Sequence, residues 1–314
     1  MPRYDAATVG AIAFMCLANG SREFPPALVS PQGVVVAAPS ATADMVAGLL
    51  PTSGTSGAPK LVQLTHRNYV MSAERLARNG GYLGSDRHYL CSPFFHTNAQ
   101  LYLCAPPLVT GGSIVPRFSA THWFDAARWT GATVASMVAP PMRMALHRAV
   151  AAGRPVDPGQ LRVVHYGMTL SRADWREWDR LVPEVHMRQI YGQTESVTGV
   201  LGGASWEQDD RVTIGRPFLG VDGVRLVRDD DTDASDGEPG ELWVRGIPGN
   251  TLMLGYHDVP EASAETIVDG RWLRTGDVSS KTFFSYLCGP RSTHGDWLLR
   301  VVVVLVRRSN LILN

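Results

Sequence analysis

Short apolar runs alternate with longer amphipathic segments along the middle of the chain. Aliphatic and β-branched residues concentrate at residues 133–138, 161–166 and 185–190, which predicts three buried strands. Apolar residues recur at helical spacing in the intervening segments 142–151 and 171–181. Strands that alternate with helices in this way predict βαβ units, so the expected fold is α/β with a mostly parallel sheet flanked by helices.

The same alternation extends toward the N-terminus. It predicts strands at residues 88–92 and 113–115 and helices at residues 65–78, 98–109 and 120–129. Pro106 and Pro107 are expected to interrupt the second of these helices. Ligands of parallel sheets bind beyond the carboxyl ends of the strands, so the segments that follow each strand are the first places to look for chemistry.

The pattern changes from residue 212 onward. Short strand candidates at residues 221–228, 240–246 and 272–273 are separated by turns rich in glycine and acidic residues. The acidic run at residues 229–236 is interpreted as a solvated hairpin loop and not as a metal site. This part of the chain therefore predicts a smaller, β-rich subdomain.

Composition narrows the class of protein. The 314 residues include 29 basic and 29 acidic side chains, so no broad basic surface for nucleic acid or anionic membrane is expected. The four cysteines are far apart, which favours a reduced, cytoplasmic chain over a disulfide-bonded or zinc-binding one. No apolar run is long enough to span a bilayer. Residues 9–18 resemble a signal-peptide core, but Asp5 precedes them and a core strand or helix is the preferred interpretation.

A glycine-rich stretch, TSGTSGAPK at residues 52–60, carries the clearest chemistry. Glycines allow backbone N–H groups to approach an anion, hydroxyls add donors, and Lys60 adds a positive charge, which together suit a polyphosphate. It is not a Walker A loop, because Leu61 follows the lysine where a Ser or Thr would be required. Taken alone, the stretch is equally consistent with a solvated turn.

Further stretches with candidate chemistry follow strands or turns. YGQTE at residues 191–195 offers an aromatic ring for a base, a hydroxyl for a phosphate and a carboxylate for Mg²⁺. TGD at residues 275–277 presents a carboxylate suited to ribose hydroxyls. PFFHTN at residues 93–98 is an aromatic cluster with one histidine. Each of these stretches is weak evidence by itself.

In this order and spacing, the stretches resemble motifs of the adenylate-forming superfamily, which includes acyl-CoA synthetases, adenylation domains of nonribosomal peptide synthetases and firefly-type luciferases. The segments that carry the resemblance are PTSGTSGAPKLVQLTHRN, PFFHTN, HYGMTLS, YGQTE, GELWVRGIPGNTLMLGYHDVP and WLRTGD. GIPGNTLMLGY and the residues after YGQTE are most similar to carnitine/crotonobetaine-type and fatty-acid CoA ligases. The resemblance implies part of the N-terminal domain of the adenylate-forming fold.

The resemblance also implies a reaction and its reagents. A carboxylate attacks the α-phosphate of Mg·ATP to give an acyl-adenylate and pyrophosphate, and the thiol of CoA then displaces AMP. The implied partners are therefore a small-molecule carboxylic acid, ATP, Mg²⁺ and CoA, with no nucleic acid. Residues 94–100 contain no aspartate that would hold an amino group, which favours a simple carboxylic acid.

Roles for individual residues follow from the resemblance. Lys60, Thr194 and Glu195 would act in catalysis, with Glu195 as the Mg²⁺ ligand and Thr194 at the α-phosphate. The nucleotide would be bound by Thr52, Ser53, Gly54, Thr55, Ser56, Gly57, Lys60, Gly167, Met168, Tyr191, Gly192, Thr194 and Asp277. Within this set Tyr191 would face the adenine and Asp277 the ribose. The acyl group would be lined by His96, Asn98 and Gly167.

The chain also departs from the family pattern, which sets the expected domains. Leu61 stands where the family usually has glycine. Only fifty residues precede the phosphate loop, where the family usually has a whole subdomain, so the chain is expected to be truncated at this end. Residues 279–314 do not resemble the mobile C-terminal domain of the family or its lysine, so truncation is expected at this end too. The expected division is a poorly assigned N-terminal remnant at residues 1–50, an α/β core at 51–211, a β-rich subdomain at 212–278 and an unrelated or frameshifted tail at 279–314.

Two alternatives remain open from the sequence. One is a non-catalytic, nucleotide-binding remnant of such an enzyme, because of the missing C-terminal lysine. The other is an adenylation unit whose acyl group passes to a carrier-protein thiol and not to CoA.

Overall fold

The computed structural model describes residues 41–52, 59–116, 121–153, 155–168, 170–203 and 213–281, and the backbone of 286–290. Its largest sheet has seven strands in the order β4-β3-β5-β6-β7-β8-β9. The strands are β3 (Arg87–Leu90), β4 (Ser113–Pro116), β5 (Val134–Val138), β6 (Val163–Gly167), β7 (His186–Gly192), β8 (Gly199–Gly202) and β9 (Arg216–Pro217). The first five in this order pair in parallel, and β8 and β9 continue the sheet antiparallel. The predicted α/β fold with a mostly parallel sheet is confirmed.

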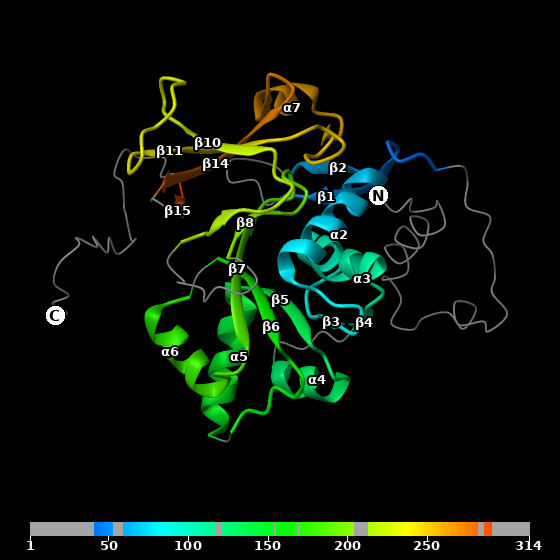
Figure 1. Cartoon of the computed structure of the whole chain (residues 1–314), viewed down its shortest axis with the longest axis vertical. Helices are drawn as coiled ribbons and strands as arrows, with labels where there is room; N and C mark the ends of the chain where they lie inside the picture. The colour runs from blue at the N-terminus through cyan, green and yellow to red at the C-terminus, as the bar shows by residue number, and fades with distance from the viewer. Residues whose placement is uncertain are drawn as a thin grey trace.

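Helices cover both faces of this sheet (Figure 1). One face packs against α4 (Trp123–Thr130), α5 (Ala139–Ala152) and α6 (Arg172–Leu181), through a core that includes Trp123, Trp178 and Tyr166. The other face packs against α2 (His66–Gly80), through Val134 and Val163. Neighbouring residues of β5 belong to opposite cores, because successive side chains of a strand point to opposite faces.

The helix expected at residues 98–109 is divided just before Pro106 and Pro107. A π-helix, η3 (Asn98–Cys104), leads directly into α3 (Ala105–Thr110), and both prolines lie in the first turn of α3. The first turn of a helix has no intrahelical acceptor for its N–H groups, so a residue without an N–H is tolerated there. For the same reason α5 begins at Ala139, before its own two prolines and earlier than the periodicity predicted.

Two smaller sheets accompany the large one. A three-stranded sheet has the order β1-β2-β12, from β1 (Val46–Pro51), β2 (Leu61–Thr65) and β12 (Gly255–Tyr256). A second sheet has the order β10-β11-β14-β13, with β15 paired to β14. Its elements are β10 (Gly223–Val227), β11 (Pro239–Arg245), β13 (Ile267–Val268), β14 (Trp272–Lys281) and β15 (Tyr286–Pro290), with α7 (Pro260–Thr266) before β13. The predicted acidic loop joins β10 to β11 and is largely exposed.

β14 is much longer than the two residues that the sequence predicted. It runs through the TGD stretch, which by composition favours a turn, because it pairs with β11 along most of its length. The register of that pairing shifts opposite Leu242, and Gly276 has a φ of 73°. The pairing therefore accommodates the glycine in a β-bulge, which reorients the residues beside it without ending the strand.

The β-rich part, residues 213–281, is held to the core by the start of α2. Thr65 is the N-cap of this helix, and its hydroxyl also donates to the carbonyl of Gly249 at 2.6 Å. The amide of Asn68 donates to the carbonyls of Asn250 at 2.6 Å and Leu252 at 2.9 Å. THRN at residues 65–68 therefore caps the helix and also fixes the loop before β12. Among the helices of the described ranges, none has both the length and the apolar content needed to cross a membrane.

Candidate functional site

The segments after β3, β6 and β7 meet at one edge of the large sheet. These strands are parallel, so their carboxyl ends share that edge. PFFHTN follows β3, Gly167 ends β6 with Met168 next to it, and QTE follows β7. The β-rich part lies beyond the same edge (Figure 1). Side-chain contacts between these segments define the candidate site.

Three side-chain hydrogen bonds connect residues that are far apart in the sequence. The hydroxyls of Thr97 and Thr194 lie 2.8 Å apart, which joins PFFHTN to YGQTE. The hydroxyl of Tyr191 donates to Oδ2 of Asp277 at 2.7 Å. The hydroxyl of Tyr256 donates to Oε1 of Glu195 at 2.9 Å. The fold thus brings together most of the stretches that the sequence singled out.

Asp277 is held from two directions. Its Oδ2 accepts from Tyr191 and also from the amide of Gln193 at 3.0 Å. The same amide donates to the carbonyl of Thr275 at 2.7 Å, which fixes the bulge in β14 against the turn after β7. No contact within the described ranges occupies Oδ1 of Asp277, so this oxygen can accept hydrogen bonds from a ligand.

Gly192 allows the turn after β7 to pack closely against its neighbours. A Cβ atom at this position would lie 2.5 Å from the carbonyl oxygen of Thr198 and 2.8 Å from the hydroxyl of Tyr102, closer than atoms can approach. Val197 in the same turn has a φ of 69° although it is β-branched and fully buried. Such a conformation costs energy, and the surrounding packing imposes it.

Lys60 and Thr52 lie at the two ends of the phosphate-loop stretch. The N–H of Thr52 donates to the carbonyl of Lys60 at 2.9 Å, so β1 and β2 bring the two ends of this stretch together. The ammonium of Lys60 lies 4.6 Å from the ring centre of Tyr256. The five other predicted phosphate contacts, Ser53, Gly54, Thr55, Ser56 and Gly57, lie outside the described residues.

Tyr256 thus contacts a cation with its ring and a carboxylate with its hydroxyl. Burial raises the pKa of Tyr256 above its ordinary value, and the charge of Glu195 and the hydrogen bond to it raise the pKa further. The phenol is therefore protonated at neutral pH and acts as the donor in the bond to Glu195. The backbone carbonyl of Glu195 is fixed as well, because it accepts from the N–H of Met253 at 2.9 Å.

The residues predicted for the acyl side lie at the same edge of the sheet. The amide nitrogen of Asn98 donates to the hydroxyl of Ser136 at 2.7 Å, and its oxygen accepts from the hydroxyl of Ser92 at 2.8 Å. His96 is exposed, with its ring 4.5 Å from that of Phe95. Asn98 is therefore oriented by its neighbours, whereas His96 is at the surface.

Gly167 ends β6 at this edge, and Met168 follows it. Gly167 pairs with Val138 at the end of β5. Met168 has a φ of 66°, a conformation that side chains rarely adopt, and its side chain is 64% exposed. An apolar side chain presented in this way offers a contact surface to a ligand at the carboxyl end of the sheet.

Sequence analysis missed three residues that hold this arrangement together: Thr97, Gln193 and Tyr256. All three belong to stretches that had been singled out, but their hydrogen-bond partners lie up to 97 residues away in the chain. Thr97 and Gln193 each stand next to a residue of expected function, which is their only sequence signal, whereas Tyr256 is marked only by its place in the GELWVRGIPGNTLMLGYHDVP segment. His66, in the THRN stretch, is the first residue of α2, and burial lowers its pKa.

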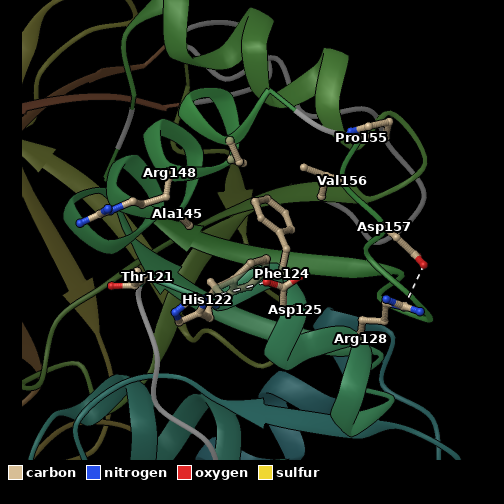
Figure 2. A pocket seen from close by; sticks show the side chains of 13 residues that line it. Thr121, His122, Phe124, Asp125, Arg128, Ala145, Arg148, Pro155, Val156 and Asp157 are labelled. Atoms are coloured by element: carbon tan, nitrogen blue, oxygen red, sulfur yellow. Dashed lines mark ion pairs between the residues drawn. The ribbon is translucent and has the colours of Figure 1, made fainter.

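A pocket of about 230 Å³ lies elsewhere, between α4, α5 and residues 155–157 (Figure 2). Phe124, Ala145 and Val156 contribute apolar lining, and Arg128 forms an ion pair with Asp157 at 2.9 Å on its rim. None of the candidate-site residues described above lines it. This pocket is therefore separate from the candidate site.

Curated relatives of this chain are CoA ligases. A crotonobetaine/carnitine–CoA ligase of Salmonella paratyphi B is 30% identical over 245 residues, covering 76% of this chain and 46% of the relative. The enzyme of the same name from Salmonella typhi matches with the same identity and coverage. The chain thus spans about half the length of the curated relatives it matches.

Solved structures show the same fold. A long-chain-fatty-acid–CoA ligase from Archaeoglobus fulgidus superposes with a TM-score of 0.70 at 24% identity, over 78% of this chain and 51% of its own. O-succinylbenzoate–CoA synthetase from Bacillus subtilis, in complex with AMP, has a TM-score of 0.68 at 24% identity, over 81% and 63% respectively.

The family assignment rests on most of the chain. The AMP-binding enzyme family matches residues 15–257, which include the phosphate-loop stretch, PFFHTN, YGQTE and the loop before β12. The match ends before TGD, but the hydrogen bond from Tyr191 places Asp277 beside the matched residues. The chain belongs to the AMP-binding enzyme family.

Proposed function

We propose that this chain binds Mg·ATP and a carboxylic acid and forms an acyl-adenylate, and that in the complete enzyme the acyl group passes to CoA. The observation that carries the proposal is the convergence of Lys60, Tyr191, Thr194, Glu195 and Asp277 through the hydrogen bonds and the ring contact described above. These residues supply a cation, hydroxyls and carboxylates, which are the groups that a magnesium nucleotide needs.

The nucleotide would lie across the turn after β7. Tyr191 has its hydroxyl bound to Asp277, so its ring is fixed and presents a flat face to the adenine. The free oxygen of Asp277 would accept from the ribose hydroxyls. Thr194 would contact the α-phosphate, and Lys60 and Thr52 the remaining phosphates.

The site fits a magnesium ion through Glu195. One carboxylate together with phosphate oxygens and water is the ligand set that Mg²⁺ commonly takes. The ion would neutralise phosphate charge as pyrophosphate leaves. In the described ranges no group of three or more acidic, histidine or cysteine side chains forms a metal site by itself, so the nucleotide would supply part of the coordination.

The chemistry requires positioning and not a protein nucleophile. A carboxylate oxygen of the acid forms a bond to the α-phosphorus, and the bond from that phosphorus to the bridging oxygen breaks, which releases pyrophosphate. The acid would lie along Val138, Gly167 and Met168 and reach toward Asn98. No acidic residue lies within residues 94–100, which favours an acid without an amino group near its carboxylate.

The test is acid-dependent release of pyrophosphate by the purified 314-residue chain. A panel of short, branched, aromatic and long-chain acids is supplied with Mg·ATP, with CoA, with a carrier protein or with neither. Release that depends on one acid supports the proposal and identifies the substrate class, and the thiol that becomes acylated identifies the acceptor. A folded chain that binds ATP but releases no pyrophosphate with any acid contradicts it and identifies a non-catalytic remnant.

A further inference from the structure

Two opposite charges flank one tyrosine at the candidate site. The ammonium of Lys60 lies against the ring of Tyr256, and the carboxylate of Glu195 accepts a hydrogen bond from its hydroxyl. Within the part of the chain that the structure describes, neither Lys60 nor Glu195 forms an ion pair. The two charged groups therefore share a neutral neighbour and do not neutralise each other.

The position of Tyr256 is fixed by the fold. It lies on β12, opposite Val62 of β2, and its N–H donates to the hydroxyl of Ser263 in α7 at 2.8 Å. Its side chain is buried in the core beneath β2, together with Val62 and Met253. A buried ring in a packed core has little rotamer freedom, so the ring face and the hydroxyl point in set directions.

We propose that Tyr256 is a positioning residue that keeps Lys60 and Glu195 apart, each oriented for its own ligand. This inference rests on the proposed function, in which Lys60 binds phosphate and Glu195 binds Mg²⁺. Without the tyrosine, an ammonium and a carboxylate this close to one side chain would pair with each other, and each ligand would then have to break that pair.

The two contacts of Tyr256 suit this role because both leave capacity for a ligand. A ring face attracts a cation without supplying a counter-charge, so the ammonium keeps its charge and its donors for phosphate. The hydroxyl occupies only Oε1 of Glu195. In the described ranges no hydrogen bond or ion pair engages Oε2, so it is available to a metal ion. A hydrogen bond that orients a metal ligand commonly strengthens metal binding.

The experiment measures ATP affinity by calorimetry, once with EDTA and once with saturating Mg²⁺. The ratio of the two dissociation constants is the magnesium effect. Tyr256→Phe keeps the ring for Lys60 but loses the bond to Glu195. It should lower the magnesium effect about tenfold while leaving the magnesium-free affinity within about twofold of the parent.

Tyr256→Leu loses both contacts, and it should lower the magnesium-free affinity as well. Adding Lys60→Met to Tyr256→Leu removes the cation that would pair with Glu195. The double variant should therefore regain part of the magnesium effect that Tyr256→Leu lost, although its magnesium-free affinity stays low. If it regains none, Tyr256 does not act by keeping the two charges apart.

Tyr69→Phe is the matched control. Tyr69 is also buried in this core, and its hydroxyl donates to Oε1 of Gln100 at 2.6 Å, away from Lys60 and Glu195. It should lower the melting temperature and leave the magnesium effect unchanged. An equal magnesium effect in parent, Tyr69→Phe and Tyr256→Phe would overturn the inference but not the proposed function. A folded parent that binds no ATP under either condition would overturn both.

Discussion

The nucleotide side and the acid side of the candidate site are built differently. On the nucleotide side, Tyr191, Glu195 and Asp277 are held by side chains from distant segments. On the acid side, Asn98 is oriented by two serines, but Phe95 and Met168 are more than half exposed and His96 is at the surface. The first arrangement positions a ligand before it arrives, whereas the second leaves apolar contacts to be completed by the ligand.

The difference has a consequence for what mutations should do. Changes on the nucleotide side break shared contacts and should affect every acid equally. Changes on the acid side should alter the choice of acid and leave ATP binding intact. The variants below test this contrast in order of expected effect.

Glu195→Ala should give the largest loss. It removes the proposed magnesium ligand, so pyrophosphate release should fall by about two orders of magnitude or more with every acid. The backbone contact of Glu195 to Met253 does not depend on the side chain, so the fold should be kept, with a melting temperature lowered only by the loss of the Tyr256 hydrogen bond. Pyrophosphate release is measured beside Glu195→Gln, and full activity in Glu195→Ala would refute the assigned role.

Asp277→Ala should give an intermediate loss. It removes the acceptor for Tyr191 and for the ribose but no charge at the reacting phosphates. The KM for ATP should therefore rise about tenfold with a smaller change in kcat. Steady-state kinetics with varied ATP checks this. Asp277→Asn keeps an acceptor, so its KM for ATP should lie between those of the parent and Asp277→Ala. An effect on kcat alone would contradict a binding role.

Acidification should lower the free energy of unfolding of the large sheet, and both sides of the site depend on this sheet. Burial lowers the pKa of His88 in β3 to about 4 and that of His165 in β6 to about 3, against 6.5 for the unfolded residues. Below pH 6.5 only the unfolded chain takes up these protons, so stability is complete above that pH and is lost as the pH falls toward 4. The slope should approach about 1.4 kcal/mol per pH unit for each histidine.

Urea unfolding between pH 7 and pH 5 measures this slope. The ring of His88 contacts the ring of Tyr82, so His88→Phe keeps an aromatic group in the core but removes one titrating site. The variant should show a shallower dependence of stability on pH than the parent. Equal slopes would mean that His88 does not contribute.

Asn98→Ala should have the smallest effect and should act on the acid side alone. It removes the bridge between Ser92 and Ser136. The KM for the preferred acid should therefore rise several-fold, which corresponds to the loss of about one hydrogen bond. The affinity for ATP should stay at the parent value. A parallel loss of ATP affinity would show that the two sides are not independent.

Local pattern predicted much of the fold. The strands and helices from β3 to β7 follow the expected order, because the spacing of apolar residues within each segment indicates its type. The errors occurred where composition and tertiary pairing disagree. Gly276 favours a turn, but pairing with β11 keeps β14 extended.

The stretches that form the candidate site were predictable from the sequence, but the contacts between them were not. The sequence by itself determined the stretches that carry the chemistry, because residue types and spacing are local properties. Only the tertiary structure decided that Thr97 meets Thr194, that Tyr191 meets Asp277 and that Tyr256 stands between Lys60 and Glu195. Such contacts join residues as far apart in the chain as Lys60 and Tyr256, and they depend on how strands pair and cores pack, which no local pattern encodes.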